Sequence, residues 1–222
     1  MRILLKYPTR SRPVQFIRTL SGWLSRASDP SKLAVLVSYD DDDVSMTADV
    51  LAQAAALHPR LTAVRGHSKN KIEACNADLW EYSEPWDVVL LVSDDMFCRC
   101  DGWDTNIRHY MKSFWPHTDG ALWFFDGHQS RINTLECVGR IRYETMGYLY
   151  HPSYKSFFCD NESTEVGLRD QRLVFLNKAL CTHESPYWGR GVPMDSLYER
   201  NQLLWDTDEA NYNERKAAGF PA

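Results

Sequence analysis

Apolar and polar residues alternate along the chain in two periodicities. Short runs of consecutive apolar residues predict buried strands, and these runs cover Ile3–Tyr7, Leu33–Val37, Leu61–Val64, Asp87–Val92 and Ala121–Phe125. Between them, apolar residues at helical spacing predict helices over Val14–Ser25, Thr47–Leu57, the segment from Lys71 to about Tyr82, and Gly102–Phe114. Strands that alternate with helices are typical of an α/β fold with a mixed, mostly parallel sheet flanked by helices.

The alternation becomes less regular after Phe125. Short helices are predicted over Arg140–Gly147 and Glu162–Gln171, and short strands over Leu173–Phe175 and Ala179–Thr182. The charged segment from Asp195 to Ala217 predicts one further helix, packed on the outside of the fold. A chain of 222 residues is long enough for one domain with a sizeable core, so we expect a single domain over residues 1–222.

The composition is that of an ordinary globular protein. The net charge of −5 argues against a surface that is basic all over, and therefore against general nucleic-acid or membrane binding. No run approaches the ~20 apolar residues of a membrane-spanning helix. The segment Met1–Lys6 has a charge on both sides of a very short apolar run, which predicts a strand instead of a signal peptide.

The six cysteines are scattered along the chain. Cys98 and Cys100 are too close in sequence for a zinc-binding pair, and no second pair matches them. Free, mostly buried thiols in the reducing cytoplasm are therefore the expected state.

Polar residues gather where the predicted parallel strands end. In open parallel sheets, ligands bind beyond the carboxyl ends of the strands. The first four strands deliver polar residues to this edge: Thr9 and Arg10, then Asp40–Asp43, then Lys69–Lys71, then Asp94 and Asp95. Carboxylates for a metal and for ribose hydroxyls, with cations for phosphate, fit a nucleotide diphosphate.

The adjacent acids Asp94 and Asp95 are the central feature of this pattern. They follow the buried run Val88–Val92, where two carboxylates are costly unless a cation joins them. A hard divalent ion that bridges two phosphates would do so. The alternative is a solvated turn that caps the next helix, and the other charged loops are likewise compatible with plain solvation.

Two later segments carry candidate chemistry. Asp160 lies before a helix whose first turn holds Glu162 and Glu165, so it is either a helix N-cap or a carboxylate that takes a proton from an attacking hydroxyl. His183 ends a short strand and is either a core or surface histidine or a nitrogen ligand to a metal.

The order of these motifs resembles small glycosyltransferases of the GT-A fold, close to the family 2 type. The resemblance covers roughly Met1 to Trp188. The matching segments are Ile3–Pro13, Val37–Asp41, Val92–Asp95, Gly147–Pro152, Phe158–Glu162 and His183.

The resemblance implies an inverting, divalent-metal-dependent transfer of a sugar from a nucleotide-diphosphate donor to an acceptor hydroxyl. The expected donor is a UDP-sugar. About residues 1–100 would bind the nucleotide sugar, about 101–190 would hold the acceptor and the catalytic groups, and 191–222 would form a helical tail. The acceptor is left open among a glycan, a lipid-linked glycan, a protein and a modified nucleobase.

Site roles follow residue by residue from the resemblance. The loops after the first two strands would hold the base and ribose through Pro8, Thr9, Arg10 and Asp40 or Asp41. Lys71 would lie near the pyrophosphate, and Asp94 would contribute to the nucleotide-sugar site. Asp95 and His183, with Asp94 beside them, would bind Mn²⁺ or Mg²⁺. Asp160 would be the catalytic base, with Glu162 as its rival.

The acids of the site depart from the family pattern. The acidic element is Ser93-Asp-Asp instead of Asp-x-Asp, so either Asp94 or Asp95 can be the acid that contacts the metal directly. Asp160-Asn-Glu replaces the commoner Glu-Asp pair, which leaves Glu162 as a rival base.

Two other functions remain as alternatives. A nucleotidyltransferase would also pair acids around a metal, but it would need a Gly-rich loop after the first strand, and the loop Pro8–Pro13 has no glycine. The other alternative is a non-catalytic nucleotide- or sugar-binding module whose acids are structural.

Overall fold

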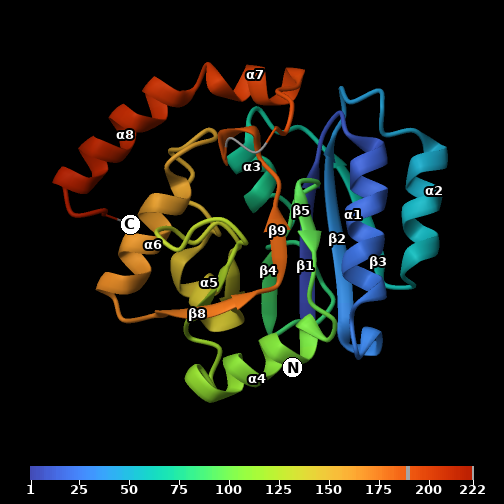
Figure 1. Cartoon of the computed structure of the whole chain (residues 1–222), viewed down its shortest axis with the longest axis horizontal. Coiled ribbons are helices and arrows are strands. Elements are labelled where there is room, and N and C mark those ends of the chain that lie inside the picture. The colour runs from blue at the N-terminus through green and yellow to red at the C-terminus, as the bar shows by residue number, and fades with distance from the viewer. Residues whose placement is uncertain (189–190, 222) are drawn as a thin grey trace.

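A seven-stranded mixed sheet forms the centre of the computed structural model, which describes residues 1–188 and 191–221 (Figure 1). The strand order is β3-β2-β1-β4-β7-β6-β8. The strands are β1 (Ile3–Thr9), β2 (Leu33–Asp40), β3 (Leu61–Gly66), β4 (Val88–Leu91), β6 (Ala121–Phe125), β7 (Cys137–Gly139) and β8 (Leu173–Ala179). Only β7 runs antiparallel to its neighbours, so the predicted mixed, mostly parallel sheet is confirmed for the described residues.

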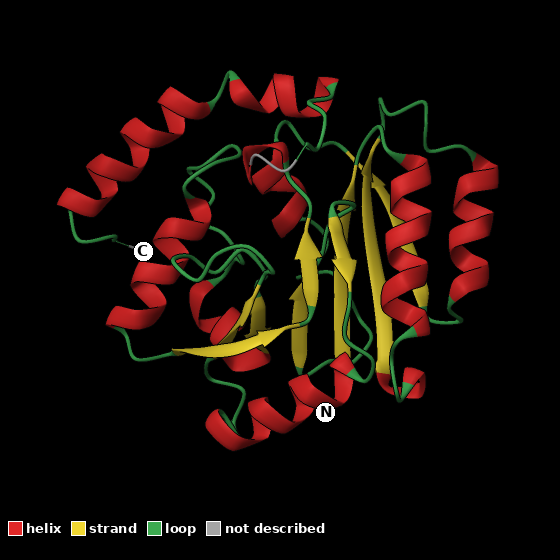
Figure 2. Cartoon of the chain, viewed as in Figure 1, coloured by secondary structure: helices red, strands yellow, loops and turns green. Residues whose placement is uncertain are grey.

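Helices cover both faces of the sheet (Figure 2). Successive residues of a strand point to opposite faces; Ile3 and Leu5 of β1 belong to one core cluster and Leu4 to the other. The first face is covered by α1 (Pro13–Ser25), α2 (Ala48–Leu57) and α4 (Trp103–Phe114). The second face is covered by α3 (Lys71–Asn76), α5 (Arg140–Met146) and α6 (Cys159–Arg169).

A second, two-stranded sheet lies beside the first and matters for the site. It pairs β5 (Met96–Cys98) with β9 (Cys181–His183) in antiparallel register, with Met96 opposite His183. The backbone N–H of Glu184 also donates to the carbonyl of Asp95 at 2.8 Å. This ribbon therefore holds His183 beside the acids that follow β4.

The sequence predictions hold to within three residues for the elements between Ile3 and Gly66 and for β4, α4 and β6. The predicted helix from Lys71 to Tyr82 is wrong, because α3 ends at Asn76. The Asn76 side chain bonds to the backbone of Leu149 and Tyr150, and Asp78 adopts a left-handed conformation that a helix cannot continue.

The C-terminal segment also differs from its prediction. It forms two helices, α7 (Ser196–Gln202) and α8 (Trp205–Ala217), instead of one. Asp195 caps α7 by accepting from the N–H groups of Leu197 and Tyr198 at 3.1 and 3.0 Å. Figure 1 shows the two helices crossing the carboxyl edge of the sheet and then passing over α6, so α7 lies across the site and not merely on the outside.

Two further boundaries differ from the predictions. Helix α6 begins at Cys159, before the predicted Glu162, and β8 extends to Ala179, beyond the predicted Phe175.

The described residues also include two short 3₁₀ helices, η1 (Pro30–Lys32) and η2 (Pro186–Trp188). Residues 189–190 and 222, which fall within the predicted catalytic half and tail, lie outside the described residues. Across the described ranges, every helix is too short or too polar to cross a membrane.

Candidate active site

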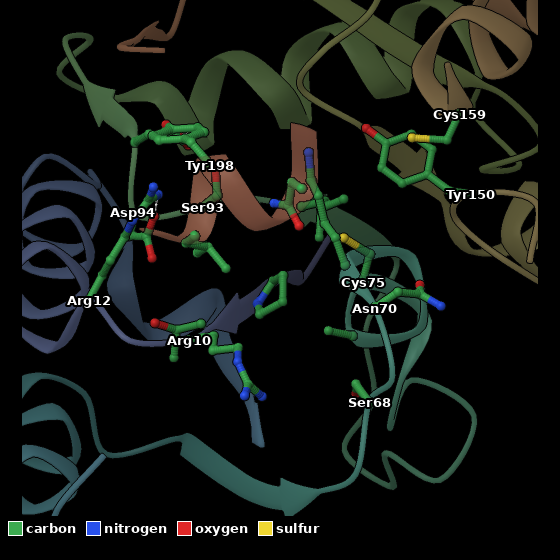
Figure 3. Close-up of a pocket in the computed structure, with 18 of the residues that line it drawn as sticks. Arg10, Arg12, Ser68, Asn70, Cys75, Ser93, Asp94, Tyr150, Cys159 and Tyr198 are labelled. Atoms are coloured by element: carbon green, nitrogen blue, oxygen red, sulfur yellow. Dashed lines mark hydrogen bonds and ion pairs between the residues drawn. The ribbon is translucent and has the colours of Figure 1, made fainter. Parts of the chain in front are cut away.

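A cavity of about 170 Å³ opens at the carboxyl ends of β1, β2 and β4, as the strand-end argument predicts (Figure 3). The N-terminal turns of α3 and α6, the end of β9 and one side of α7 complete its wall. Nine of the predicted site residues line it: Pro8, Thr9, Arg10, Asp40, Lys71, Asp94, Asp95, Asp160 and His183. The fold therefore brings together segments that are far apart in the sequence.

Asp95 is the acid that faces His183. Nε2 of His183 lies 3.5 Å from Oδ2 of Asp95, and the same oxygen accepts a 2.7 Å hydrogen bond from the Tyr198 hydroxyl. The Ser93 hydroxyl donates to Oδ1. Burial opposes the charge on Asp95, but the attraction of His183 and these hydrogen bonds outweigh it, so the pKa of Asp95 lies below its usual range.

Asp94 has a different partner. Its Oδ1 accepts from the Arg12 guanidinium at 2.9 Å, and both side chains are buried (Figure 3). Burial and the neighbouring charge of Asp95 raise the pKa of Asp94 to about 7 in spite of Arg12. Arg12 also pairs with Asp195 at 2.8 Å and lies 4.2 Å from the ring centroid of Tyr198. Asp94 is thus paired with the Arg12 guanidinium, whereas Asp95 faces His183.

The pair formed by Asp95 and His183 fits a divalent ion that arrives with a diphosphate. Their 3.5 Å separation is long for a hydrogen bond, but one ion with ligand distances of about 2.0–2.2 Å can contact both atoms. Within the described residues, no group of three or more His, Cys, Asp or Glu side chains is placed to hold a metal by itself. Mg²⁺-type ions are commonly held by one or two protein ligands, with substrate phosphates and water completing the shell. The residues present therefore suit an ion shared with a substrate.

The other end of the cavity is formed by the loops after β1 and β2. Arg10 pairs with Asp40 and with Asp42, and the N–H of Ser68 donates to Oδ1 of Asp40 at 3.2 Å. The buried hydroxyl of Thr9 has no hydrogen-bond partner among the described residues. A buried polar atom without a partner at a cavity wall is available to a ligand.

Cations that are free of ion pairs also line the cavity. Lys69, Lys71 and Arg200 make no salt bridge within the described part of the chain, and Arg200 is contributed by α7. Loss of hydration lowers the pKa of Lys71, but the charges of Cys159 and Cys75, and then of Asp95 and Asp160, give a net rise. These cations leave positive charge available for an anionic ligand.

Asp160 lies in the first turn of α6 and lines the cavity. The residue at the N-cap is Phe158, so the alternative prediction of Asp160 as the N-cap is wrong. Burial raises the pKa of Asp160, although Lys71 and His183 attract its charged form. A carboxyl group with a raised pKa at a cavity wall is a candidate general base.

Two of the predicted site residues lie elsewhere. Asp41 is exposed, and its Oδ1 lies 3.3 Å from Nδ1 of His67. Glu162 is buried away from the cavity, where Arg215 holds it through two bonds of 2.8 and 2.7 Å. The structure does not bring either residue together with the other nine.

Sequence reasoning missed Arg12 and Tyr198. Arg12 belongs to the loop Pro8–Pro13 that was singled out, but its pairing with Asp94 has no sequence signal. Tyr198 lies in a charged helix whose pattern does not say which surface it covers. The capping signal of Asp195 was present in the sequence, since an acid followed by a helix is a common start signal.

Comparison with known proteins identifies the fold. No protein-family model and no curated protein sequence matches the chain. Among solved structures, the mannosyltransferase PcManGT from Pyrobaculum calidifontis, in complex with GDP-Man and Mn²⁺, matches 98% of this chain and 64% of its own, with a TM-score of 0.73 and 15% identity. S. aureus TarS 1–349 in complex with UDP-GlcNAc matches 92% of this chain and 65% of its own, with a TM-score of 0.64 and 14% identity.

A third match is glucosyl-3-phosphoglycerate synthase from Mycobacterium tuberculosis in complex with Mn²⁺, UDP and glucosyl-3-phosphoglycerate. It covers 100% of this chain and 81% of its own, with a TM-score of 0.62 and 12% identity. The chain spans less than two thirds of the first two structures. The predicted GT-A fold is therefore confirmed.

Proposed function

We propose that this chain is a divalent-metal-dependent glycosyltransferase that moves a sugar from a nucleotide-diphosphate donor, a UDP-sugar, to an acceptor hydroxyl with inversion. One observation carries the proposal. The facing pair of Asp95 and His183 lines the same cavity as Asp160, at the carboxyl edge of a GT-A sheet. The structural neighbours that contain GDP-Man or UDP-GlcNAc support a nucleotide-sugar donor.

The donor would bind along the wall formed by residues 1–100. Arg10, Asp40 and the unpaired hydroxyl of Thr9 form the end suited to base and ribose. Lys71 lines the cavity and makes no salt bridge among the described residues, which suits a pyrophosphate contact. Residues 101–190 contribute Asp160 and His183, and so would form the acceptor and catalytic half of a single domain.

Asp95 and His183 are the residues that would hold Mn²⁺ or Mg²⁺. A bound ion would supply Lewis-acid stabilisation of the negative charge that grows on the departing diphosphate. Arg12 would compete with an ion for Asp94, because it already bonds to Oδ1 of that carboxylate. Lys71 would add a second positive group near the same leaving group.

Asp160 would accept the proton of the acceptor hydroxyl as that oxygen attacks the anomeric carbon. The bond from the anomeric carbon to the diphosphate breaks in the same step, through an oxocarbenium-like transition state. The two thiols at the cavity wall are poor nucleophiles, because burial raises the pKa of both Cys75 and Cys159. We therefore propose a single displacement with inversion, in which Asp160 is the base and none of the described cavity residues forms a covalent intermediate.

We place the reaction in the cytoplasm. All six cysteines are free thiols, including Cys98 and Cys181, which lie opposite each other on β5 and β9. Cysteines that lie opposite each other on neighbouring strands without a disulfide bond are consistent with a reducing compartment.

The test of the proposed function is donor turnover with water as the acceptor. Release of UDP from UDP-GlcNAc and UDP-glucose, and of GDP from GDP-mannose, is measured with Mn²⁺ and with EDTA. Slow release that Mn²⁺ stimulates supports the transferase. Binding without turnover supports the non-catalytic module, and release of a nucleoside monophosphate would instead support the nucleotidyltransferase.

A further inference from the structure

Helix α8 contacts the segment that leads into Asp160. Within this mostly exposed helix, Asp208 is only 1% exposed. Its carboxylate accepts hydrogen bonds from three successive backbone N–H groups, those of Lys155 at 3.0 Å, Ser156 at 2.7 Å and Phe157 at 2.8 Å. Hydrogen bonds to an ionised acceptor are about twice as strong as neutral ones. Asp208 therefore fixes the backbone of this segment.

The segment next passes through Phe158, whose φ of +61° is left-handed. This conformation is strained for a bulky residue, so the surroundings must hold it. Two rings of α8 do so: Trp205 and Tyr212 lie 5.0 and 5.5 Å from the Phe158 ring. Helix α6 starts immediately afterwards, with Asp160 in its first turn.

A second anchor from α8 holds the same turn of α6. Arg215 donates two hydrogen bonds to the buried carboxylate of Glu162, at 2.8 and 2.7 Å, and the Tyr154 hydroxyl adds a third at 2.7 Å. Glu162 is two residues beyond Asp160. The first turn of α6 is thus fixed on its approach by Asp208 and within the turn by Arg215.

The Asp160 side chain depends on this backbone for its place. Within the described residues, its only hydrogen-bond donor is the N–H of the adjacent Asn161, at 3.0 Å. We propose that Asp208 is a positioning residue for Asp160, acting through the backbone of residues 155–158. This inference rests on the proposed function, in which Asp160 is the base.

The substitution Asp208→Asn keeps the size of the side chain but turns one acceptor oxygen into an N–H₂ group that faces a backbone donor. A displacement of about 1 Å at a catalytic group costs on the order of 10²-fold in rate. We expect D208N to lower kcat for Mn²⁺-stimulated release of UDP from a UDP-sugar by roughly 10- to 100-fold. The KM of the donor and the affinity for UDP with Mn²⁺ should change less than about threefold, because donor-side residues are untouched. D206N, at an exposed acid of the same helix, is the matched control and should leave kcat unchanged.

The double variant D160N/D208N distinguishes positioning from a general structural role. If Asp208 acts through Asp160, D208N costs nothing further once Asp160 has lost its function. A further loss in the D160N background equal to that in the wild type would overturn the inference, as would an unchanged kcat in D208N. If D208N does not fold, Asp208→Glu, which keeps the carboxylate but lengthens the side chain by one methylene group, is put through the same cycle and judged by the same criteria. Absence of turnover by the wild type would instead contradict the proposed function, and the inference with it.

Discussion

The hydroxyl of Tyr198 donates a 2.7 Å hydrogen bond to Oδ2 of Asp95, which joins residues 103 positions apart in the sequence. This bond ties α7 to the acid that follows β4. Arg12 adds a second tie, since it pairs with Asp195 at the start of α7 and with Asp94. Helix α7 is therefore a cover over the cavity that two polar anchors attach to the sheet edge.

Removing the first anchor should loosen this cover. We expect Tyr198→Phe to speed amide hydrogen exchange in residues 196–202, because one anchor of α7 is lost while the phenyl ring is kept. Hydrogen exchange followed by mass spectrometry measures this. Tyr212→Phe in α8 is the control and should leave residues 196–202 unchanged. Equal exchange in the wild type and Y198F would show that the bond does not hold α7.

The buried pair of Arg12 and Asp94 should contribute to stability. We expect Arg12→Met to lower the free energy of unfolding by about 3–5 kcal/mol, because it leaves the Asp94 carboxylate buried without its partner. Arg26→Met removes an exposed pair with Asp101 and should cost at most about 1 kcal/mol. Urea denaturation compares the two variants. Similar losses in both would refute the assignment of a buried, stabilising pair.

The two candidate bases should separate in kinetics. Asp160→Asn should leave donor affinity intact and lower turnover by about two to four orders of magnitude, since it removes the proton acceptor. Glu162→Gln should cause a smaller loss, because Glu162 lies outside the cavity and bonds to Arg215. Initial rates of UDP release and calorimetric UDP affinities check both variants. A larger loss for E162Q than for D160N would transfer the role of base to Glu162.

Glu136 should make stability depend on pH. Burial, and to a lesser extent Asp160, raise the pKa of this carboxyl from 4.5 to about 8, against the Ser163 hydrogen bond and Arg142. The folded chain thus keeps a proton that the unfolded chain loses near pH 4.5. The contribution of Glu136 to stability is full below that pH and falls as pH rises towards 8.

Glu136→Gln cannot ionise and should remove this fall. Between pH 5 and 8, the free energy of unfolding of the wild type should fall relative to that of E136Q, by up to about 1.4 kcal/mol per pH unit. Chemical denaturation at several pH values measures the difference. Glu144→Gln, at an exposed acid, should run parallel to the wild type. A parallel curve for E136Q would place the Glu136 pKa near its ordinary value.

Strand ends were the part of the site that the sequence could predict. Arg10, Asp40 and Asp94 follow strongly apolar strands, and parallel strands bring their carboxyl ends to one edge whatever the details of packing. Local sequence makes Asp160 and His183 candidates, but only the family resemblance assigns them roles, because no periodic pattern places them at that edge.

The remaining features depend on tertiary contacts that leave no local signal. Strands β5 and β7 have three residues each, which is too short for a periodicity to be recognised. Tyr198 reaches Asp95 only because α7 folds back over the sheet, and the exposed face of that helix looks like any solvated helix in sequence. Arg12 likewise donates a hydrogen bond to Asp94, although the two residues are 82 positions apart in the sequence.

Above all, we infer that Asp95 holds a divalent cation that binds the diphosphate of the donor. Calorimetric titration of UDP in Mn²⁺ and in EDTA, with the wild type and Asp95→Asn, tests it most directly. Asp101→Asn, at an exposed acid nearby in sequence, is the control. We predict that Mn²⁺ tightens UDP binding by roughly tenfold or more in the wild type and D101N, about 1.4 kcal/mol, and that D95N loses this effect. The same gain from Mn²⁺ in D95N, or no gain in the wild type, would contradict the account.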